Sequence, residues 1–308
     1  LDLNVIQTKR GLELLKVAAM YGSNGGGKSN FIQAMTMMKE VVHNSFSDSL
    51  KEIDQRTPYN AQFKLNTATE KSDSFFEVSF LVDEVIYRYG FEINGFLIQR
   101  EWLYRKVDRE IALFHRKGST FEINKESFSE GEKYKSEINA NVLLISHLAQ
   151  HNQEISKLVF GWFAKMNVIS GLHERQYEKV TPRLLQSDSR FKTWLGMALK
   201  FLEITDIELG EKDGKIVTYH SQYDENKLLV GSVPFPLDLM ESEGTKKLSY
   251  FLGPVYDTLR NGKILFVDEF DTKLHPNLSK RLMELFHRNN TRGAQLIFTA
   301  QDASLMDK

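Results

Sequence analysis

A glycine-rich run that ends in Lys-Ser holds the residues of this chain best suited to chemistry. In order, its residues are Gly22, Ser23, Asn24, Gly25, Gly26, Gly27, Lys28 and Ser29. They satisfy the pattern G-x-x-x-x-G-K-[ST], in which glycines let backbone N–H groups turn inward around phosphate oxygens. In such a loop the lysine reaches the β- and γ-phosphates, and the serine hydroxyl ligates Mg²⁺. The pattern therefore predicts a site for a nucleoside triphosphate, with Mg²⁺.

The segments on either side of this run are those that the pattern requires. Residues 15–21 are mostly apolar and indicate a short buried strand. Residues 29–44 indicate a helix, because apolar side chains recur at helical spacing at Phe31, Ala34, Met35, Met38 and Val42. The positive end of that helix dipole would face the phosphates. This context favours a phosphate-binding loop over a chance glycine turn.

A second candidate site lies where an apolar strand, residues 263–267, ends in Asp268 and Glu269. A strand buried in a parallel sheet ends at the edge where ligands bind. There Asp268 could hold Mg²⁺ through water beside Ser29, and Glu269 could polarise the attacking water as general base. Taken alone, the pair is equally well explained as solvated acids after a strand. Together with the glycine-rich loop, it favours hydrolysis of ATP.

A third segment precedes a helix expected over residues 244–259, and it consists of Ser242, Glu243, Gly244 and Thr245. Serine, glycine and threonine at a helix start offer hydrogen-bond donors for a γ-phosphate. An ordinary N-cap is the alternative, and without the other two segments it would be preferred.

Composition places the chain among globular proteins. It has 308 residues, 26% charged and 41% hydrophobic, with a net charge of −1. That balance does not favour nucleic acid as a general partner, although a local basic patch could still form. The absence of cysteine excludes disulfides, thiolate metal sites and cysteine nucleophiles, and fits a cytoplasmic protein. No signal peptide or membrane-length apolar run is found. Because the chain starts at Leu1 rather than Met, we expect it to be a fragment.

The order of expected elements predicts an α/β fold in two lobes. Residues 1–130 and 205–308 would form one nucleotide-binding α/β core with an antiparallel β arm, interrupted by a helical insertion at 131–204. Residues 45–70 are polar and indicate irregular structure. The strands of the arm are expected at residues 74–81, 84–93, 96–106, 111–116 and 120–123. A further hairpin is expected at 204–209 and 215–220, a helix at 277–288, and a last buried strand at 295–299.

The three segments together resemble those of SMC/RecF-like ABC ATPase heads. Residues 21–30 (YGSNGGGKSN) look like their Walker A, which adds Asn30 to the nucleotide site. Residues 241–247 (ESEGTKK) look like a degenerate signature, and residues 266–276 (FVDEFDTKLHP) look like Walker B with its D-loop. Within that superfamily, the chain resembles the AAA-type ATPases of bacterial anti-phage systems, such as the RloA-like, PARIS AriA and Septu PtuA proteins. Residues 162–163 (WF) and 168–173 (VISGLH) support this subgroup.

The resemblance implies a P-loop ABC-type ATPase head that binds ATP and Mg²⁺. ATP would be held between Walker A of one copy and the signature of a second, and hydrolysis at Glu269 would release the pair. It further implies a sensor or regulatory ATPase of anti-phage defence that controls a nuclease effector. The rival interpretations are a RecF/SMC-like repair ATPase that binds DNA directly and an ATP-gated scaffold with little turnover. Long heptad arms of the SMC kind are absent from the sequence.

The chain departs from the family pattern in two places. Gln301 stands where a switch histidine is usual, and a glutamine can bond a γ-phosphate or water but cannot carry a proton, so hydrolysis is expected to be slow. The strands and aromatic residue that usually flank adenine are not recognisable near the start.

The resemblance also implies a Q-loop glutamine that ligates Mg²⁺. Gln150 is the first candidate for it, and Gln62 is the second. For either residue, an ordinary surface glutamine is an equal alternative.

Two further patterns have ordinary explanations. His147 and His151 are spaced i, i+4, but they lack a third zinc ligand, so a packed or solvated helix face is preferred. The aromatic strands between Phe75 and Tyr104 could form a nucleic-acid stacking platform, and a sheet core explains them better.

Overall fold

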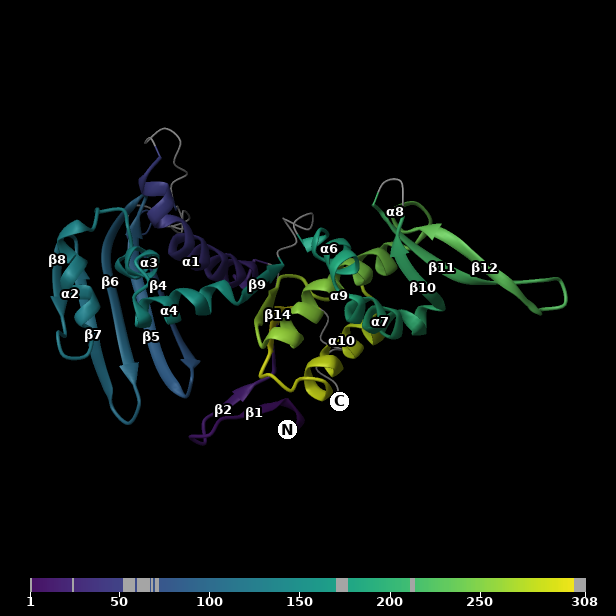
Figure 1. Ribbon diagram of the computed structural model, residues 1–308, viewed down its shortest axis with the longest axis horizontal. Helices are drawn as coiled ribbons and strands as arrows, with labels where there is room; N and C mark the ends of the chain where they lie inside the picture. The colour runs from purple at the N-terminus through teal and green to yellow at the C-terminus, as the bar shows by residue number, and fades with distance from the viewer. Residues whose placement is uncertain are drawn as a thin grey trace. The chain divides into compact units, whose positions relative to one another are not determined.

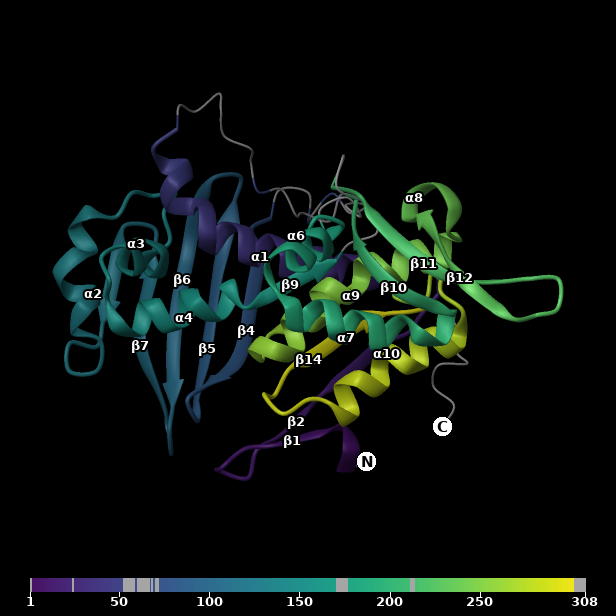
Figure 2. The ribbon, with the colours of Figure 1, turned by 45° about the vertical axis from the view of Figure 1, so that its right-hand side comes forward.

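The computed structural model describes residues 2–23, 25–51, 59, 67, 69, 72–169, 177–210 and 214–301. The chain divides into two compact units. The first unit contains residues 1–6, 14–32 and 167–308, and the second contains residues 7–13 and 33–166. Figures 1 and 2 show the ribbon from two directions.

A four-stranded sheet forms the centre of the first unit. Its strands lie in the order β3 (Val17–Met20), β14 (Gln295–Thr299), β13 (Ile264–Val267) and β9 (Met166–Ile169). β14 pairs in parallel with both β3 and β13. Most side chains of β13 and β14 are buried, as expected for parallel strands covered on both faces. The mixed α/β class and the buried strands near residues 263–267 and 295–299 are confirmed. The strand near residues 15–21 is present as β3, but only Val17 of it is buried, so the prediction that it is buried was wrong. β9 is a correction, because the helical pattern predicted for 131–204 concealed a strand.

Helices α9 (Glu243–Asn261) and α10 (Pro276–Arg288) pack against this sheet, and α6 (Val180–Ser187) and α7 (Ser189–Leu199) pack against α9 (Figure 1). The short α8 (Leu237–Met240) contacts the antiparallel sheet described next. Sequence signals fix their ends: Ser242 caps the start of α9, Gly262 ends it with φ 59°, and Pro276 opens α10. The core between helices and sheet consists mostly of aliphatic side chains, and it also contains the buried rings of Phe191, Phe251, Phe270, Phe286 and Phe298.

A second, antiparallel sheet belongs to the same unit. Its strands β10 (Ile204–Leu209), β11 (Ile216–Tyr223) and β12 (Leu229–Pro236) lie in that order. The hairpin expected at 204–209 and 215–220 is confirmed as β10 and β11, whereas β12 was not predicted. Figures 1 and 2 both show β11 and β12 extending away from α8 and β10.

The second unit is built on a five-stranded antiparallel meander. The strands, in sequence order and spatial order alike, are β4 (Ser74–Val82), β5 (Val85–Asn94), β6 (Leu97–Lys106), β7 (Glu110–Lys117) and β8 (Thr120–Ile123). This arm is confirmed strand by strand. The helices of the unit are α2 (Ser129–Tyr134), η3 (Lys135–Glu137), α3 (Leu144–Gln150), α4 (Glu154–Ala164) and most of α1 (Lys28–Ser49). Residues 45–49 were expected to be irregular, but they form the end of α1. The remaining elements of the chain are short: η1 (Asp2–Asn4), β1 (Val5–Gln7), β2 (Glu13–Leu15) and η5 (Lys200–Leu202).

The structure divides the expected helical insertion. Residues 131–166 group with the β arm, and residues 167–204 group with the four-stranded sheet. The expected boundary between core and insertion therefore differs from the division by contacts. Within the described residues, no helix has the length and apolar character needed to cross a membrane.

His147 and His151 lie on α3 with their rings stacked at 4.5 Å between centroids. His147 also contacts Phe46 and Tyr134, and burial lowers the pKa of its imidazole. No group of three metal-ligating side chains occurs within the described ranges. The pair is thus accounted for by packing.

A buried charged cluster ties α3 to the sheet of the second unit. The carboxylate of Glu101, on β6, accepts hydrogen bonds from the Tyr89 hydroxyl (2.9 Å) and from the backbone N–H of Leu144 (2.7 Å) and Ile145 (3.2 Å). The guanidinium of Arg116 lies 3.6 Å away, and both charged side chains are fully buried. Burial raises the pKa of Glu101, and the Arg116 charge opposes that rise. The carboxylate therefore serves as both helix cap and counter-ion.

Replacing this carboxylate should destabilise the second unit strongly. In Glu101→Leu, Arg116 loses its counter-ion and two helix N–H groups lose their acceptor, so we expect a loss of about 3–5 kcal/mol in the free energy of unfolding. Urea unfolding followed by circular dichroism measures it. The matched control is Glu92→Leu on neighbouring β5, whose exposed partner Arg100 lies 3.5 Å away, with an expected loss under about 1 kcal/mol. Equal losses in the two variants would contradict the cluster's role.

Candidate functional site: a nucleotide pocket at the sheet edge

One pocket of about 340 Å³ in the first unit brings the glycine-rich loop and the acid pair together. It is lined by Gly25, Gly26, Gly27, Lys28, Ser29, Asn30, Asp268, Glu269 and Gln301. These residues come from three distant parts of the sequence, each following a strand of the parallel sheet. Asn24 lies outside the described residues. Gly22 and Ser23 do not line the pocket; their carbonyl oxygens accept hydrogen bonds from Lys28.

The loop needs glycine for steric reasons at three positions. Gly25 and Gly27 have φ of 76° and 85°, in the left-handed region that residues with a Cβ rarely adopt. Gly26 has an ordinary φ, but a Cβ there would lie 3.0 Å from the Ser23 carbonyl oxygen. The same closeness lets the Gly26 N–H donate to that oxygen at 3.0 Å.

Lys28 begins α1, so its ammonium sits at the positive end of the helix dipole. The Nζ donates to the carbonyl oxygens of Gly22 (2.7 Å) and Ser23 (3.0 Å). The helix is joined to the loop by the Phe31 N–H, which donates to the Gly27 carbonyl. The lysine is therefore folded against its own loop, within the pocket that a phosphate would enter.

Thr299, the last residue of β14, connects the two acids, and it was not singled out from the sequence. Its buried hydroxyl donates to Asp268 Oδ1 at 2.6 Å and accepts from the Glu269 N–H at 2.9 Å. The Thr299 carbonyl also accepts from the Phe270 N–H at 3.0 Å. One residue of the central strand thus fixes the carboxylate of Asp268 and the backbone of Glu269.

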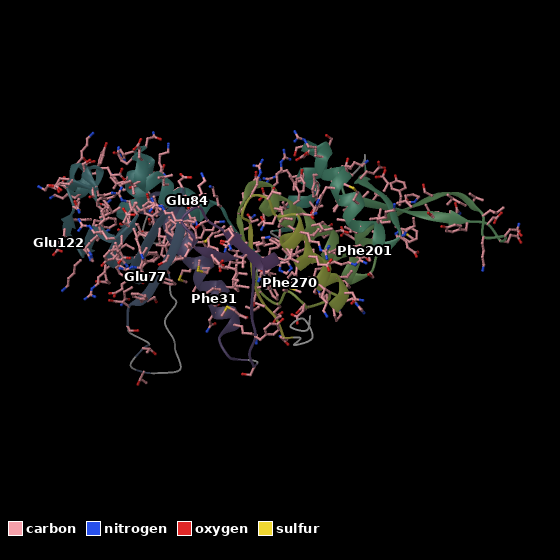
Figure 3. The ribbon with its side chains drawn as sticks, turned by 90° about the horizontal axis from the view of Figure 1, so that it is seen from below. Phe31, Glu77, Glu84, Glu122, Phe201 and Phe270 are labelled. Atoms are coloured by element: carbon pink, nitrogen blue, oxygen red, sulfur yellow. The ribbon has the colours of Figure 1, made fainter. Side chains whose placement is uncertain are left out.

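Glu269 itself has a left-handed backbone, with φ 50°. A non-glycine residue adopts this region at a cost, and it does so where its surroundings enforce it. Here the enforcement comes from Thr299 on one side and from Phe270 on the other. The Phe270 ring, labelled in Figure 3, is fully buried. Its centroid lies 4.4 Å from that of the Phe298 ring. The turn therefore presents the Glu269 side chain to the pocket.

Gln301 lies at the pocket and is exposed. Its backbone N–H donates to Asp271 Oδ2 at 2.9 Å, which links the chain after β14 to the turn after β13. This contact places the amide side chain beside the acids. The role of Gln301 in place of a switch histidine stays a prediction.

The predicted signature residues begin α9 and are not among the residues that line this pocket. Ser242 accepts from the Thr245 N–H at 3.2 Å, and the two hydroxyls lie 2.9 Å apart, so Thr245 is buried as part of the cap. Glu243 is exposed and pairs with Lys246 at 2.9 Å, which lowers the pKa of its carboxyl. A Cβ on Gly244 would lie 3.1 Å from the Lys273 carbonyl oxygen. The segment is thus an N-cap in structure, and its proposed second role needs another copy.

Lys247 also contacts the turn that carries the acids, and the sequence analysis did not predict this role. Its Nζ donates to the carbonyl oxygens of Thr272 (2.5 Å) and Glu269 (3.4 Å). With Asp268 and Glu269 it also lines a small cavity of about 50 Å³. The start of α9 is in this way joined to the acid turn of the same chain.

Gln150 ends α3 as an exposed residue of the second unit, whereas the other candidate ligands belong to the first. Its assignment as a magnesium ligand stays a prediction. Gln62 lies outside the described residues.

The donor set at the pocket fits Mg²⁺. The cation takes oxygen ligands, keeps several waters and is typically bound through one or two carboxylates plus phosphate oxygens. The Ser29 hydroxyl and the Asp268 carboxylate line the same pocket. Since a carboxylate has two oxygens, Asp268 can serve the cation while Oδ1 still accepts from Thr299.

Removing the Thr299 hydroxyl should weaken the site without unfolding it. Thr299→Val keeps the shape of the side chain but leaves the Glu269 N–H without its acceptor, which costs about 1–3 kcal/mol. We expect Mg²⁺-dependent ATP hydrolysis to fall at least about tenfold, the equivalent of 1.4 kcal/mol. The control is Thr258→Val, another buried threonine of the same unit, whose hydroxyl bonds Asn167. If both variants keep the parental rate, Thr299 has no part in the site.

Solved structures similar to this one include SMC heads and RecF. The SMC head domain from Thermotoga maritima is 13% identical with a TM-score of 0.41, covering 99% of this chain and 88% of that one. An Smc head domain derived from Pyrococcus furiosus, bound to the C-terminal domain of ScpA, is 11% identical with a TM-score of 0.31, covering 94% and 84%. The recombination mediator protein RecF is 11% identical with a TM-score of 0.30, covering 98% and 91%. No curated protein matches the sequence.

A family model matches residues 17–307, nearly the whole chain. The family is described as an AAA domain, putative AbiEii toxin, Type IV TA system. The matched span contains the glycine-rich loop, the segment at the start of α9 and the acid pair. This chain therefore belongs to that family of AAA domains.

Proposed function

We propose that the chain is a Mg²⁺-dependent ATPase of the ABC type that works as a pair of copies. The observation that carries the proposal is the pocket in which Lys28 and Ser29 meet Asp268 and Glu269. A phosphate-binding loop at a helix start, a serine hydroxyl and two carboxylates at one sheet edge are the parts that phosphoryl transfer to water requires.

Each residue has a role that follows from its place. Backbone N–H groups of the glycine-rich loop and the Lys28 ammonium bind the phosphates, and Lys28 exchanges the carbonyls of Gly22 and Ser23 for phosphate oxygens. Ser29 and Asp268 hold Mg²⁺, which supplies charge neutralisation of the phosphate oxygens. Glu269 accepts a proton from the attacking water as general base. Thr299 keeps both acids in position.

The signature segment supports the pairing. Ser242, Glu243, Gly244 and Thr245 do not line the pocket of their own chain, yet they form a helix start whose N–H groups favour an anion. We infer that this helix start binds the γ-phosphate held by a second copy. Glu243 is exposed, and its pairing with Lys246 offsets the negative charge that it would bring to a phosphate.

The test separates binding, pairing and chemistry. Glu269→Gln should retain ATP, lose at least about a hundredfold in hydrolysis, and sediment as a dimer with Mg²⁺ and ATP, because the general base is lost while the binding groups remain. Lys28→Ala should lose both ATP binding and the dimer, and Glu284→Gln, on the exposed face of α10, is the control. Analytical ultracentrifugation and phosphate release provide the readouts. A Glu269→Gln protein that binds ATP normally but stays monomeric would contradict the proposed pairing.

A second interpretation, an ATP-gated scaffold with little turnover, is favoured by one residue. Gln301 lines the pocket where the proton-carrying histidine of similar ATPases is expected, and an amide cannot carry a proton. The rate of steady-state phosphate release from the parent protein separates the two. The ATPase proposal requires turnover that depends on Glu269, and the scaffold requires none.

We further propose that the ATPase is the sensor or regulatory component of an anti-phage system that controls a nuclease effector. The resemblance to defence ATPases and the family description support this role. Phage plating on cells that carry the native locus tests it. The parent locus should reduce plaque number, and Lys28→Ala should abolish that protection.

A further inference from the structure

The helix that begins with the predicted signature, α9, contains Gly253 and Pro254 side by side near its middle. Glycine and proline are the two residue types least favourable inside a helix. Because proline has no N–H, the carbonyl of Tyr250, four residues earlier, lacks the donor that an ordinary helix would give it. Both residues are nevertheless buried. The sequence thus places a local defect in a part of α9 that is enclosed by its own unit.

Thr181, on α6, compensates for this defect from outside the helix. Its hydroxyl donates to the carbonyl oxygens of Tyr250 (2.8 Å) and Ser249 (3.1 Å), which share its one proton. The same hydroxyl accepts from the Gly253 N–H at 3.2 Å, and Thr181 is fully buried. A side chain of another helix therefore takes the place of the N–H that Pro254 lacks. We call Thr181, Gly253 and Pro254 the α9 joint.

The close approach of α6 to α9 requires glycine at position 253. A Cβ there would lie 2.4 Å from Thr181 Oγ1 and 2.8 Å from the Thr181 backbone nitrogen, closer than such atoms approach in real structures. Since one of these atoms belongs to the backbone, rotation of a side chain would not relieve the contact. The two helices are therefore fitted to each other at the α9 joint (Figure 1).

The α9 joint separates two parts of the helix that have different contacts. Before it, Lys247 donates to carbonyl oxygens of the turn that carries the acids. After it, Asp257 and Thr258 both accept from the side-chain amide of Asn167, on β9, at 3.0 Å. The first part is thus attached to the acid turn, and the second part is attached to the four-stranded sheet.

We propose that Thr181 is a positioning residue for the paired site, because the α9 joint sets where the predicted signature lies. This inference rests on the proposed pairing through Ser242. Ser242 precedes Gly253 by 11 residues, which is roughly 16 Å of helix. Over that length, a change in direction of about 5° at the joint moves the helix start by about 1.4 Å. A misplacement of about 1 Å at a reacting site can cost a hundredfold in rate, so the joint must be held accurately.

The first test removes the hydroxyl and keeps the shape of the side chain. Thr181→Val and the rescue variant Thr181→Ser are made in the Glu269→Gln protein. The control is Thr258→Val, which removes another fully buried threonine hydroxyl, from α9 itself. Analytical ultracentrifugation gives the dissociation constant of the dimer with Mg²⁺ and ATP. The affinity of the monomer for a fluorescent ATP analogue is measured at low protein concentration.

We expect Thr181→Val to raise the dissociation constant of the dimer at least tenfold. Thr181→Ser and Thr258→Val should raise it less than threefold, because each leaves a hydroxyl at the α9 joint. The affinity of the monomer for the nucleotide should change less than twofold in every variant, since the glycine-rich loop is not altered.

A second variant separates position from stability. Pro254→Ala returns an N–H to the helix and removes its least favourable residue, so the melting temperature should equal or exceed that of the parent. The dissociation constant of the dimer should nevertheless rise at least tenfold, because the direction of the first part of α9 changes. A merely structural role of the joint predicts the opposite, normal pairing in a protein that is at least as stable.

The outcomes distinguish this inference from the proposed function. If the Glu269→Gln protein pairs and either Thr181→Val or Pro254→Ala pairs equally well, the positioning inference fails and the proposed function stands. The inference also fails if Thr258→Val weakens the dimer as much as Thr181→Val does, since the loss then reflects general stability. If the Glu269→Gln protein forms no ATP-dependent dimer, the proposed pairing fails, and the positioning inference fails with it.

Discussion

The hydroxyl of Thr299 is the interaction on which the geometry of the site depends. It is buried at the end of the central strand, where it donates to Asp268 and accepts from the Glu269 N–H. On its other side, β14 pairs with β3, and Thr299 is the register partner of Met20, the residue where β3 ends before the glycine-rich loop. Thr299 therefore connects the acids, through its hydroxyl, to the strand that leads into the loop. A shift in the register of β14 against either neighbouring strand would therefore change the distance between the loop and the acids.

The sheet explains why residues so far apart in sequence meet. Parallel strands bring their carboxyl ends to one edge, and here the loop follows β3, the acids follow β13 and Gln301 follows β14. The backbone of Glu269 accepts an unfavourable φ because Thr299 and the buried Phe270 hold it from both sides. Stability of the core and geometry of the site are thus properties of the same contacts.

The sequence predicts the site better than it predicts the units. Motifs such as residues 22–29 specify backbone conformations and charges by residue type, so they can be recognised locally. Thr299 could not be recognised, because a threonine in an apolar strand is ordinary and its role exists only through register. β9 and β12 were missed because one lies in a helical pattern and the other contains two prolines. Glu101 shows a further reason: a glutamate in a strand is ordinarily exposed, yet this one is fully buried, because its partners come from other elements that the sequence does not bring together.

The position of Lys28 has a consequence for how a ligand enters. The ammonium is coordinated by two carbonyl oxygens of its own loop. The chain thus carries its own acceptors for the group that would bind a phosphate. Entry of a ligand is an exchange of partners for one ammonium group, with little change in the number of its contacts. Selectivity then follows from charge, since only an anion with several oxygens offers that ammonium more than two neutral carbonyls do.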